Sequence, residues 1–237
     1  MKTEYHPADS RGHASHGWLE SYHSFSFASY YNPNRMQFGK LRVLNDDRVA
    51  PGQGFGTHPH RNMEIISIPL EGDLEHKDSM GNVSVIRQGD VQVMSAGTGV
   101  SHSEYNKNSD AEVKFLQIWI LPDTLNAEPR YDQISLEVEN LKNTLYPVLG
   151  PKGKHDGLWI HQDAWFHMGH FYAGTQVTHN LQNPEHGLYL FLLEGSVNAG
   201  GVAMHRRDGL AIRDTGEVAL NFTADSQILL MEVPMAS

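Results

Sequence analysis

The sequence predicts an all-β protein built from two antiparallel β-barrels, the second a duplicate of the first. Short apolar segments recur at intervals of roughly ten residues with glycine turns between them, a pattern typical of β-sandwiches and barrels. The turn at Leu70-Glu71-Gly72 also recurs at Leu193-Glu194-Gly195. A duplicated barrel unit explains this repeat, and the chain of 237 residues is long enough for two such units.

The first half contains most of the predicted strands. Most are rich in β-branched or aromatic residues, and several alternate apolar and polar side chains at a period of two. Glycine-containing turns or a proline end each segment. The predicted strands are 63–70, 74–78, 83–87, 91–95 and 113–121.

The pattern changes between Pro122 and Lys154. This stretch is polar and is broken by Pro129, and we expect one short helix near residues 136–141 and no strand. Strands resume at 157–161 and 167–173. We therefore predict an N-terminal barrel at 1–122, a connecting segment at 123–154 and a C-terminal barrel at 155–237.

Two short motifs in the first half place possible metal ligands two residues apart. They are His58-Pro59-His60 and His102-Ser103-Glu104, and both lie in segments that read as strands. Side chains at i and i+2 of a strand share one face, so each pair presents both of its ligands together. Three imidazoles and one carboxylate suit a divalent first-row transition metal.

The second half is predicted to lack these ligands. Counting from its Leu-Glu-Gly turn, the positions of His58 and His60 fall on Leu181 and Asn183. The position of His102 falls near Ala219 or Leu220. The C-terminal barrel is therefore expected to be a scaffold without a metal.

Composition excludes several classes of function. The formal net charge is −10, with 28 acidic and 18 basic residues, which argues against direct nucleic-acid binding. The chain has no cysteine, so thiolate zinc sites, disulfides and thiol nucleophiles are excluded. The N-terminal residues lack the apolar core of a signal peptide, and no apolar run approaches a membrane span. We expect a cytoplasmic protein that does not bind a membrane, and its oligomeric state stays open.

The order of the motifs resembles the pirin family of bicupins, within the cupin superfamily, over nearly the whole chain. A cupin motif of Gly, His-x-His and Glu is similar to Gly52, His58, His60 and Glu64, with the glutamate one position early. His102 lies two residues beyond the usual cupin histidine, as in pirins. Further matching segments are Arg11-Gly12-His13, Phe25-Ser26-Phe27, His76-Lys77-Asp78-Ser79 and Met94-Ser95-Ala96-Gly97.

The resemblance implies two packed jelly-roll barrels with one metal, in the N-terminal barrel only. It implies the ligands His58, His60, His102 and Glu104. It also implies an activity, because the family includes metal-dependent quercetin 2,3-dioxygenases. These open the central ring of a flavonol with dioxygen and release carbon monoxide. Some eukaryotic members instead act as iron-binding transcriptional coregulators, and a non-enzymatic, metal-binding regulatory role is the alternative.

We expect Glu104 to be both a metal ligand and the general base that takes the flavonol hydroxyl proton. Iron is the expected metal, although manganese, cobalt, nickel, copper or zinc suits the same ligands. Glu64 is expected to lie behind the ligands as a supporting residue. Aromatic and apolar residues expected near the cavity are Phe25, Phe27, Met63 and Trp119. The histidines expected to be structural or exposed are His13, His16, His23, His76, His167, His170 and His179.

Overall fold

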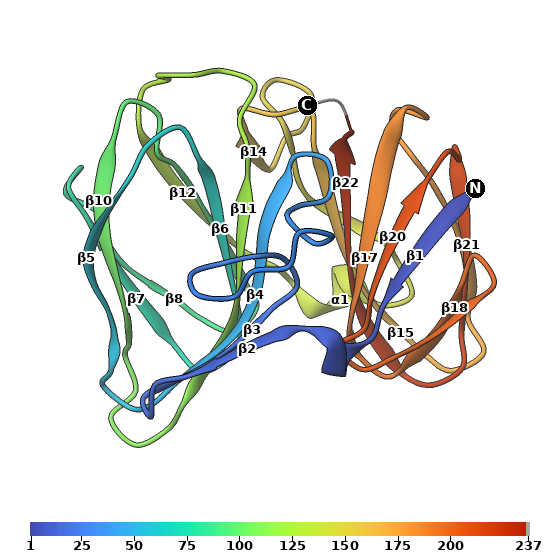
Figure 1. Cartoon of the computed structure of the whole chain (residues 1–237), viewed down its shortest axis with the longest axis horizontal. Coiled ribbons are helices and arrows are strands. Elements are labelled where there is room, and N and C mark those ends of the chain that lie inside the picture. The colour runs from blue at the N-terminus through green and yellow to red at the C-terminus, as the bar shows by residue number, and fades with distance from the viewer. Residues whose placement is uncertain (236–237) are drawn as a thin grey trace.

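The computed structural model describes residues 1–235 and shows two β-barrels lying side by side (Figure 1). Each barrel combines one seven-stranded sheet with one four-stranded sheet. Within the described residues, one strand pair near the junction of the two barrels is parallel and the other pairs are antiparallel. The predicted fold class, an all-β bicupin with two antiparallel barrels packed together, is confirmed.

The first barrel holds eleven of the strands. Its larger sheet consists, in spatial order, of β12 (Arg130–Ser135), β9 (Asp90–Ser95), β6 (Glu64–Glu71), β11 (Val113–Ile120), β4 (Leu41–Val49), β3 (Leu19–His23) and β2 (Gly12–Ser15). Its smaller sheet consists of β5 (Gly54–His60), β10 (Val100–Asn106), β7 (Leu74–Asp78) and β8 (Val83–Ile86).

The second barrel has the same construction. Its larger sheet consists of β1 (Lys2–His6), β20 (Gly209–Arg213), β17 (His186–Glu194), β22 (Ser226–Pro234), β15 (Trp165–Phe171), β13 (Tyr146–Pro151) and β14 (Leu158–Ile160). Its smaller sheet consists of β16 (Gln176–Asn180), β21 (Glu217–Phe222), β18 (Ser196–Ala199) and β19 (Val202–His205). The helical turns are η1 (Ala8–Ser10) and α1 (Val138–Leu141).

The strand order confirms the internal duplication. The run β9-β6-β11-β4 recurs as β20-β17-β22-β15, and β5-β10-β7-β8 recurs as β16-β21-β18-β19. The two Glu-Gly turns occupy the same place, since one joins β6 to β7 and the other joins β17 to β18. A single topology has therefore been used twice.

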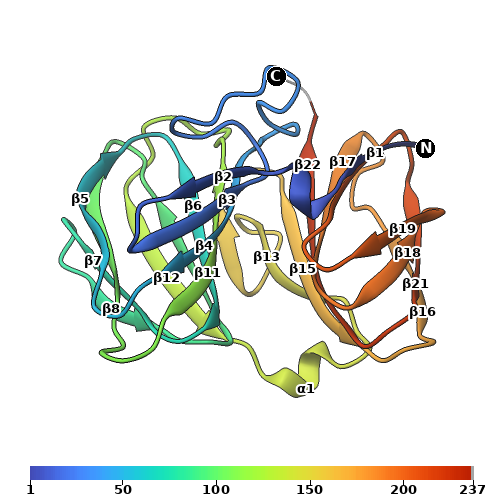
Figure 2. The ribbon, with the colours of Figure 1, turned by 60° about the horizontal axis from the view of Figure 1, so that its bottom comes forward.

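The segment predicted to lack strands contains two of them. Strand β12 pairs with β9 of the first barrel, and β13 pairs with β15 of the second. Every residue of β12 is half-buried or exposed, so its sequence carries no apolar alternation that could have revealed it. The expected short helix is present as α1, which lies at the junction between the barrels (Figure 2).

The N-terminal strand β1 crosses to the second barrel, where it pairs with β20. Figure 1 shows this blue strand among the orange and red strands. It fills the edge position that β12 fills in the first barrel. The barrel limits at residues 122 and 154 stay a prediction. The pairings show that β1, from the start of the chain, completes the second barrel, and that β12, from the connecting segment, completes the first.

The longest apolar run of the chain, residues 188–193, lies in β17 between two cores. Its odd-numbered members Tyr189 and Phe191 pack into the cluster that joins the two barrels. Its even-numbered members Leu188 and Leu190 pack inside the second barrel. A strand buried on both faces needs apolar residues without alternation, and this explains the run.

The interiors of the two barrels differ. The second is filled by one continuous apolar cluster that includes Leu190, Leu220 and Leu230. The first has two smaller apolar clusters, and buried Glu104 and Gln117 also lie within this barrel. The first barrel thus keeps buried polar groups that need partners. The second also encloses two buried histidines, His167 and His179, whose ring centroids lie 4.9 Å apart.

Strand pairing corrects the predicted equivalences between the halves. His58 lies opposite His102 across β5 and β10, and His179 lies opposite Val218 across β16 and β21. The position of His58 therefore holds His179, and the position of His60 holds Leu181. The count was wrong by two residues because the connection into β17 is two residues longer than the one into β6. One of the four ligand positions thus keeps a histidine.

Candidate metal centre

The two ligand motifs lie on neighbouring strands of the four-stranded sheet. His58 on β5 and His102 on β10 are direct cross-strand partners, and His60 lies opposite Val100. The three imidazole rings meet at centroid distances of 4.5–4.9 Å. One nitrogen of each ring lies within 4.8 Å of the others. The spacing of two residues thus brings the rings together, side by side on one sheet.

The unpaired nitrogens of the three rings fit a metal. The Nδ1 atom of His58 bonds the carbonyl of Gly56 at 2.8 Å, so its Nε2 is the nitrogen available for binding. The Nε2 atoms of His60 and His102 are buried and have no hydrogen-bond partner among residues 1–235. Buried polar atoms are rarely left unpaired, and three converging imidazole nitrogens suit a divalent transition metal.

Burial keeps two of these rings neutral. Burial and the neighbouring His58 lower the pKa of His60 to about 4. Burial and the surrounding imidazoles lower the pKa of His102 to about 2. Metal ions bind neutral imidazole, so no proton has to be displaced from either ring at neutral pH.

A buried chain of hydrogen bonds fixes the tautomer of His102. The Nε2 atom of His76 bonds Oδ2 of Asp78 at 3.0 Å, so His76 carries its proton there because a carboxylate only accepts. The Nδ1 atom of His76 is then an acceptor, and Nδ1 of His102 donates to it at 3.4 Å. Nε2 of His102 is thereby left without a proton, as metal binding requires.

Replacing His76 with phenylalanine should therefore weaken metal binding. The variant keeps an aromatic ring beside Tyr131, whose ring centroid lies 4.7 Å from that of His76, but removes the acceptor that orients His102. We expect the dissociation constant for nickel(II), measured by isothermal titration calorimetry, to rise by about 10- to 100-fold. An unchanged constant in a variant with unchanged thermal stability would show that His76 does not position the ligand.

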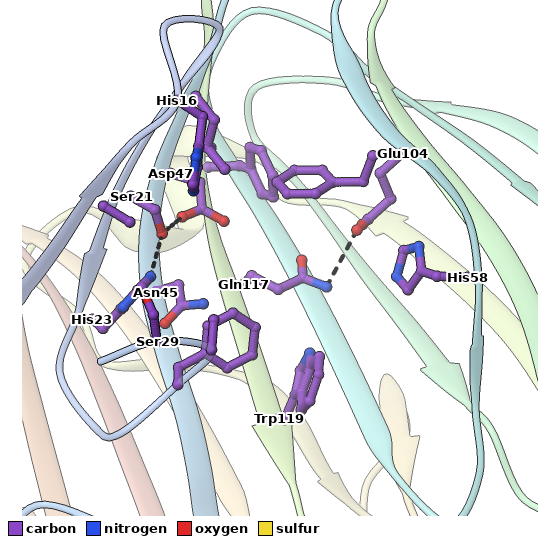
Figure 3. A pocket seen from close by; sticks show the side chains of 16 residues that line it. His16, Ser21, His23, Ser29, Asn45, Asp47, His58, Glu104, Gln117 and Trp119 are labelled. Carbon is purple, nitrogen blue, oxygen red and sulfur yellow. Dashed lines mark hydrogen bonds between the residues drawn. The ribbon is translucent and has the colours of Figure 1, made fainter. Parts of the chain in front are cut away.

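Glu104 is buried in the barrel interior, where polar side chains hold its carboxylate. Ser67 Oγ donates to Oε1 at 3.0 Å, and Gln117 Nε2 donates to Oε2 at 3.4 Å. Burial raises the pKa of Glu104 to about 7. Figure 3 shows the carboxylate directed toward Gln117, with His58 beside it.

The structure divides the four predicted ligands between two clusters. His58, His60 and His102 form one, and Glu104 forms the other together with His102 and His76. His102 belongs to both clusters, so the Glu104 carboxylate lies next to the three imidazoles. Its hydrogen bonds go to side chains on β6 and β11. The four-residue ligand set stays a prediction. His76 was expected to be structural or exposed. The one feature of the sequence that could have indicated its role is Asp78, two residues later on the same strand.

Glu64 lies outside both clusters. It accepts a hydrogen bond from Ser95 Oγ at 2.6 Å, and its other oxygen bonds Nδ1 of His161 at 3.2 Å. Since His161 follows β14, this buried carboxylate joins the two halves of the chain. The contacts of Glu64 therefore do not support the predicted role behind the metal ligands.

A cavity opens between the cluster and strands β3 and β4 (Figure 3). Rings continue edge to face from His60 to Trp119 at 5.0 Å and from Trp119 to Phe27 at 5.3 Å. Phe27 and Trp119 line the cavity as predicted. The other two expected residues do not, because Phe25 packs between the barrels and Met63 packs against a core cluster.

The stability of the protein should depend on the ionisation of Asp47, which is buried in the cavity wall. Burial raises the pKa of Asp47 from 3.8 to about 7. The unfolded chain loses this proton first as pH rises, so the carboxyl lowers the free energy of unfolding between about pH 4 and pH 7. The free energy of unfolding of Asp47→Asn, relative to that of the wild type, should therefore rise by about 1.4 kcal/mol for each pH unit across this range.

Urea denaturation of both proteins at about pH 4, 6 and 8 measures this difference. Ser21 donates a hydrogen bond to Asp47, and the asparagine oxygen can accept it in the variant. A free-energy difference that stays constant with pH would contradict the account.

Comparison with known proteins agrees with a duplicated cupin fold and a metal centre. The Pirin family profile matches residues 5–120, and that of the quercetinase C-terminal cupin domain matches residues 147–233. The fold and the histidine cluster define a bicupin of the metal-binding type. The chain belongs to the pirin family.

Two relatives illustrate its place there. A quercetin 2,3-dioxygenase of Escherichia coli strain K12 is 43% identical over 227 residues, covering 96% of each chain. A pirin-like protein of Caulobacter vibrioides is 38% identical over 227 residues, covering 95% of this chain and 97% of the relative.

Among solved structures, the bacterial pirin YhhW from Escherichia coli in complex with nickel(II) has a TM-score of 0.94. It is 41% identical in sequence, and the match covers 99% of this chain and all of that one. A metal ion therefore binds to a protein of this family with nearly the same fold. Within residues 1–235, no helix is long and apolar enough to cross a membrane.

Proposed function

We propose that the protein is a metal-dependent dioxygenase that cleaves flavonols such as quercetin. The observation that carries the proposal is a cluster of three convergent imidazoles beside a buried carboxylate, in which His58 and Glu104 line an aromatic-walled cavity. The relatives named quercetin 2,3-dioxygenase support the substrate class. Flavonol and dioxygen are the proposed small-molecule partners.

His58, His60, His102 and Glu104 would hold one divalent transition metal. Iron is proposed first, and the nickel complex of the bacterial pirin makes nickel the first alternative. When bound, such an ion supplies Lewis acidity that lowers the pKa of a chelating hydroxyl and a position for dioxygen.

The residues of the chain would orient the flavonol and move one proton. The edge-to-face rings of Phe27 and Trp119 give the cavity an aromatic wall suited to a planar substrate. Glu104 would take the proton of the 3-hydroxyl on one carboxylate oxygen, as a general base. Ser67 and Gln117 hold the carboxylate when it is not engaged. One flavonol and one dioxygen then give the ring-opened product and carbon monoxide.

Anaerobic reconstitution tests this proposal. The protein is loaded in turn with iron, manganese, cobalt, nickel, copper or zinc, and quercetin and air are then added. We expect the flavonol absorbance to fall and carbon monoxide to appear in equal amount with at least one redox-active metal. Zinc has no redox chemistry and serves as the matched inert control.

Tight metal binding without turnover for any of the metals would overturn the proposal. That result would favour the non-enzymatic, metal-binding regulatory role. The acidic net charge of −10 argues against direct contact of such a protein with nucleic acid, so its partner would be another protein.

A further inference from the structure

The wall of the cavity opposite Glu104 carries a second group of buried polar side chains. Ser21 and His23 come from β3, and Asn45 and Asp47 come from β4. Each is at most 5% exposed, and all four line the cavity. Figure 3 shows them together on one side, with His58 and Glu104 on the other. In the described part of the chain, none of the four side chains is hydrogen-bonded to a proposed metal ligand, so the metal centre does not explain why they are there.

The hydrogen bonds of this group determine where its protons lie. Ser21 Oγ donates its single proton to Oδ1 of Asp47. Its oxygen therefore accepts from Nε2 of His23, at 2.8 Å. Burial lowers the pKa of His23 to about 4, so the ring carries only this one proton. Nδ1 of His23 is consequently a bare acceptor.

Two acceptors on this wall have no protein partner among residues 1–235. They are Nδ1 of His23 and Oδ1 of Asn45. A buried acceptor without a donor costs free energy, typically on the order of 1–3 kcal/mol. A ligand that presents hydroxyl protons to this wall would satisfy both atoms.

This arrangement differs from a nucleophilic triad. In a triad the histidine lies between the serine and the acid, and the acid orients its second nitrogen. Here Ser21 lies between His23 and Asp47, and Nδ1 of His23 has no partner among the described residues. The serine donates to a carboxyl and is not deprotonated by a base, so the group is built for binding.

The aromatic wall reaches this group. His23 packs edge to face on Phe27 at 5.3 Å, and Phe27 packs on Trp119 in the same way. Rings therefore extend without a break from the metal ligand His60 to His23. A planar aromatic molecule along this wall would have one end at the imidazole cluster and the other at the two bare acceptors.

We propose that Ser21, His23, Asn45 and Asp47 form a subsite that binds phenolic hydroxyl groups on a ring of the substrate remote from its chelating hydroxyl and ketone. The subsite rests on the proposed function for its substrate class, and it makes the enzyme selective for polyhydroxylated flavonols. The ring hydroxyls donate to Nδ1 of His23 and Oδ1 of Asn45.

Anaerobic binding to the nickel-loaded protein, followed by flavonol fluorescence, tests the subsite without turnover. Three ligands are compared: quercetin, 3-hydroxyflavone, which keeps only the chelating pair, and quercetin with the hydroxyls of its outer rings methylated. The methylated ligand keeps oxygen atoms but has no protons to donate at those positions. We expect quercetin to bind about ten-fold more tightly than either of the others.

Asn45→Leu removes one acceptor at similar size and breaks no side-chain hydrogen bond of the described structure. It should reduce the preference for quercetin by about three- to ten-fold and leave the affinity for 3-hydroxyflavone unchanged. Phe27→Leu is the matched control, because it shortens the aromatic wall and should weaken all three ligands alike. Should Asn45→Leu fail to fold, His23→Phe removes the other acceptor and keeps the ring beside Phe27.

The subsite is overturned if the methylated ligand binds as tightly as quercetin, or if the preference survives in both acceptor variants. The failure of the proposed function would look different. In that case no metal would support turnover, while the binding preference and its loss in Asn45→Leu would persist. Equal turnover of 3-hydroxyflavone and quercetin, with equal affinities, would remove the subsite and leave the dioxygenase intact.

Discussion

Replacing His60 with alanine is expected to abolish both tight metal binding and flavonol turnover. Nε2 of His60 is one of the three convergent nitrogens and has no other partner among residues 1–235. Substituting a residue that hydrogen-bonds to a metal ligand lowers the affinity for the metal by about 10- to 100-fold. Loss of the ligand itself should therefore lower this affinity by more than about 100-fold. Metal content after dialysis and the rate of quercetin loss measure the two effects.

His13→Ala is the matched control for this variant. His13 lies half-exposed on β2. Its hydrogen bond is to Glu20, which does not belong to the histidine cluster. Its loss should leave the metal content and the rate unchanged. Full metal content in His60→Ala would contradict the assigned centre, and full turnover without the metal would contradict a metal-dependent reaction.

Replacing Glu104 with glutamine should slow turnover strongly even in protein that is fully loaded with metal. Glutamine keeps the length of the side chain and can still accept from Ser67, but it cannot take a proton. Loss of a positioned general base costs about 10²- to 10⁴-fold in kcat. We expect a fall of this size in single-turnover measurements with the metal-loaded protein.

Glu64→Gln provides the control, because it makes the same substitution at a second buried glutamate of the same barrel. Glu64 bonds Ser95 and His161, and neither of them belongs to the metal clusters. Its turnover should stay within a few-fold of the wild type. A Glu104→Gln protein with both full metal content and full turnover would show that Glu104 is not the base.

Much of the fold could be predicted because its strands carry a local pattern. Strands β6 to β9 and β11 alternate or are uniformly apolar between glycine turns, and the repeat of Leu-Glu-Gly marks the duplication. Strand β12 carries no such pattern because every residue is half-buried or exposed. The pairing of β1 with β20 joins segments about 200 residues apart, and no local signal specifies such a contact.

The candidate site was predictable for His58 and His60, which lie two apart on one strand, but not for Glu104, which lies two residues from His102 and belongs to the other cluster. His58, His60 and His102 converge as that spacing predicts. The roles of His76 and His23 depend on partners from other strands, such as His102 on β10 and Phe27 beyond β3. A single histidine in a sequence with 15 of them does not reveal such partners.

The central claim is that both atoms of dioxygen enter the flavonol while carbon monoxide leaves. It is tested most directly by supplying heavy-isotope dioxygen to the iron- or nickel-loaded protein with quercetin and weighing the ring-opened product. The account predicts that the product carries both heavy atoms and that the carbon monoxide carries none. A product with one heavy atom or none, or flavonol loss without carbon monoxide, would contradict it.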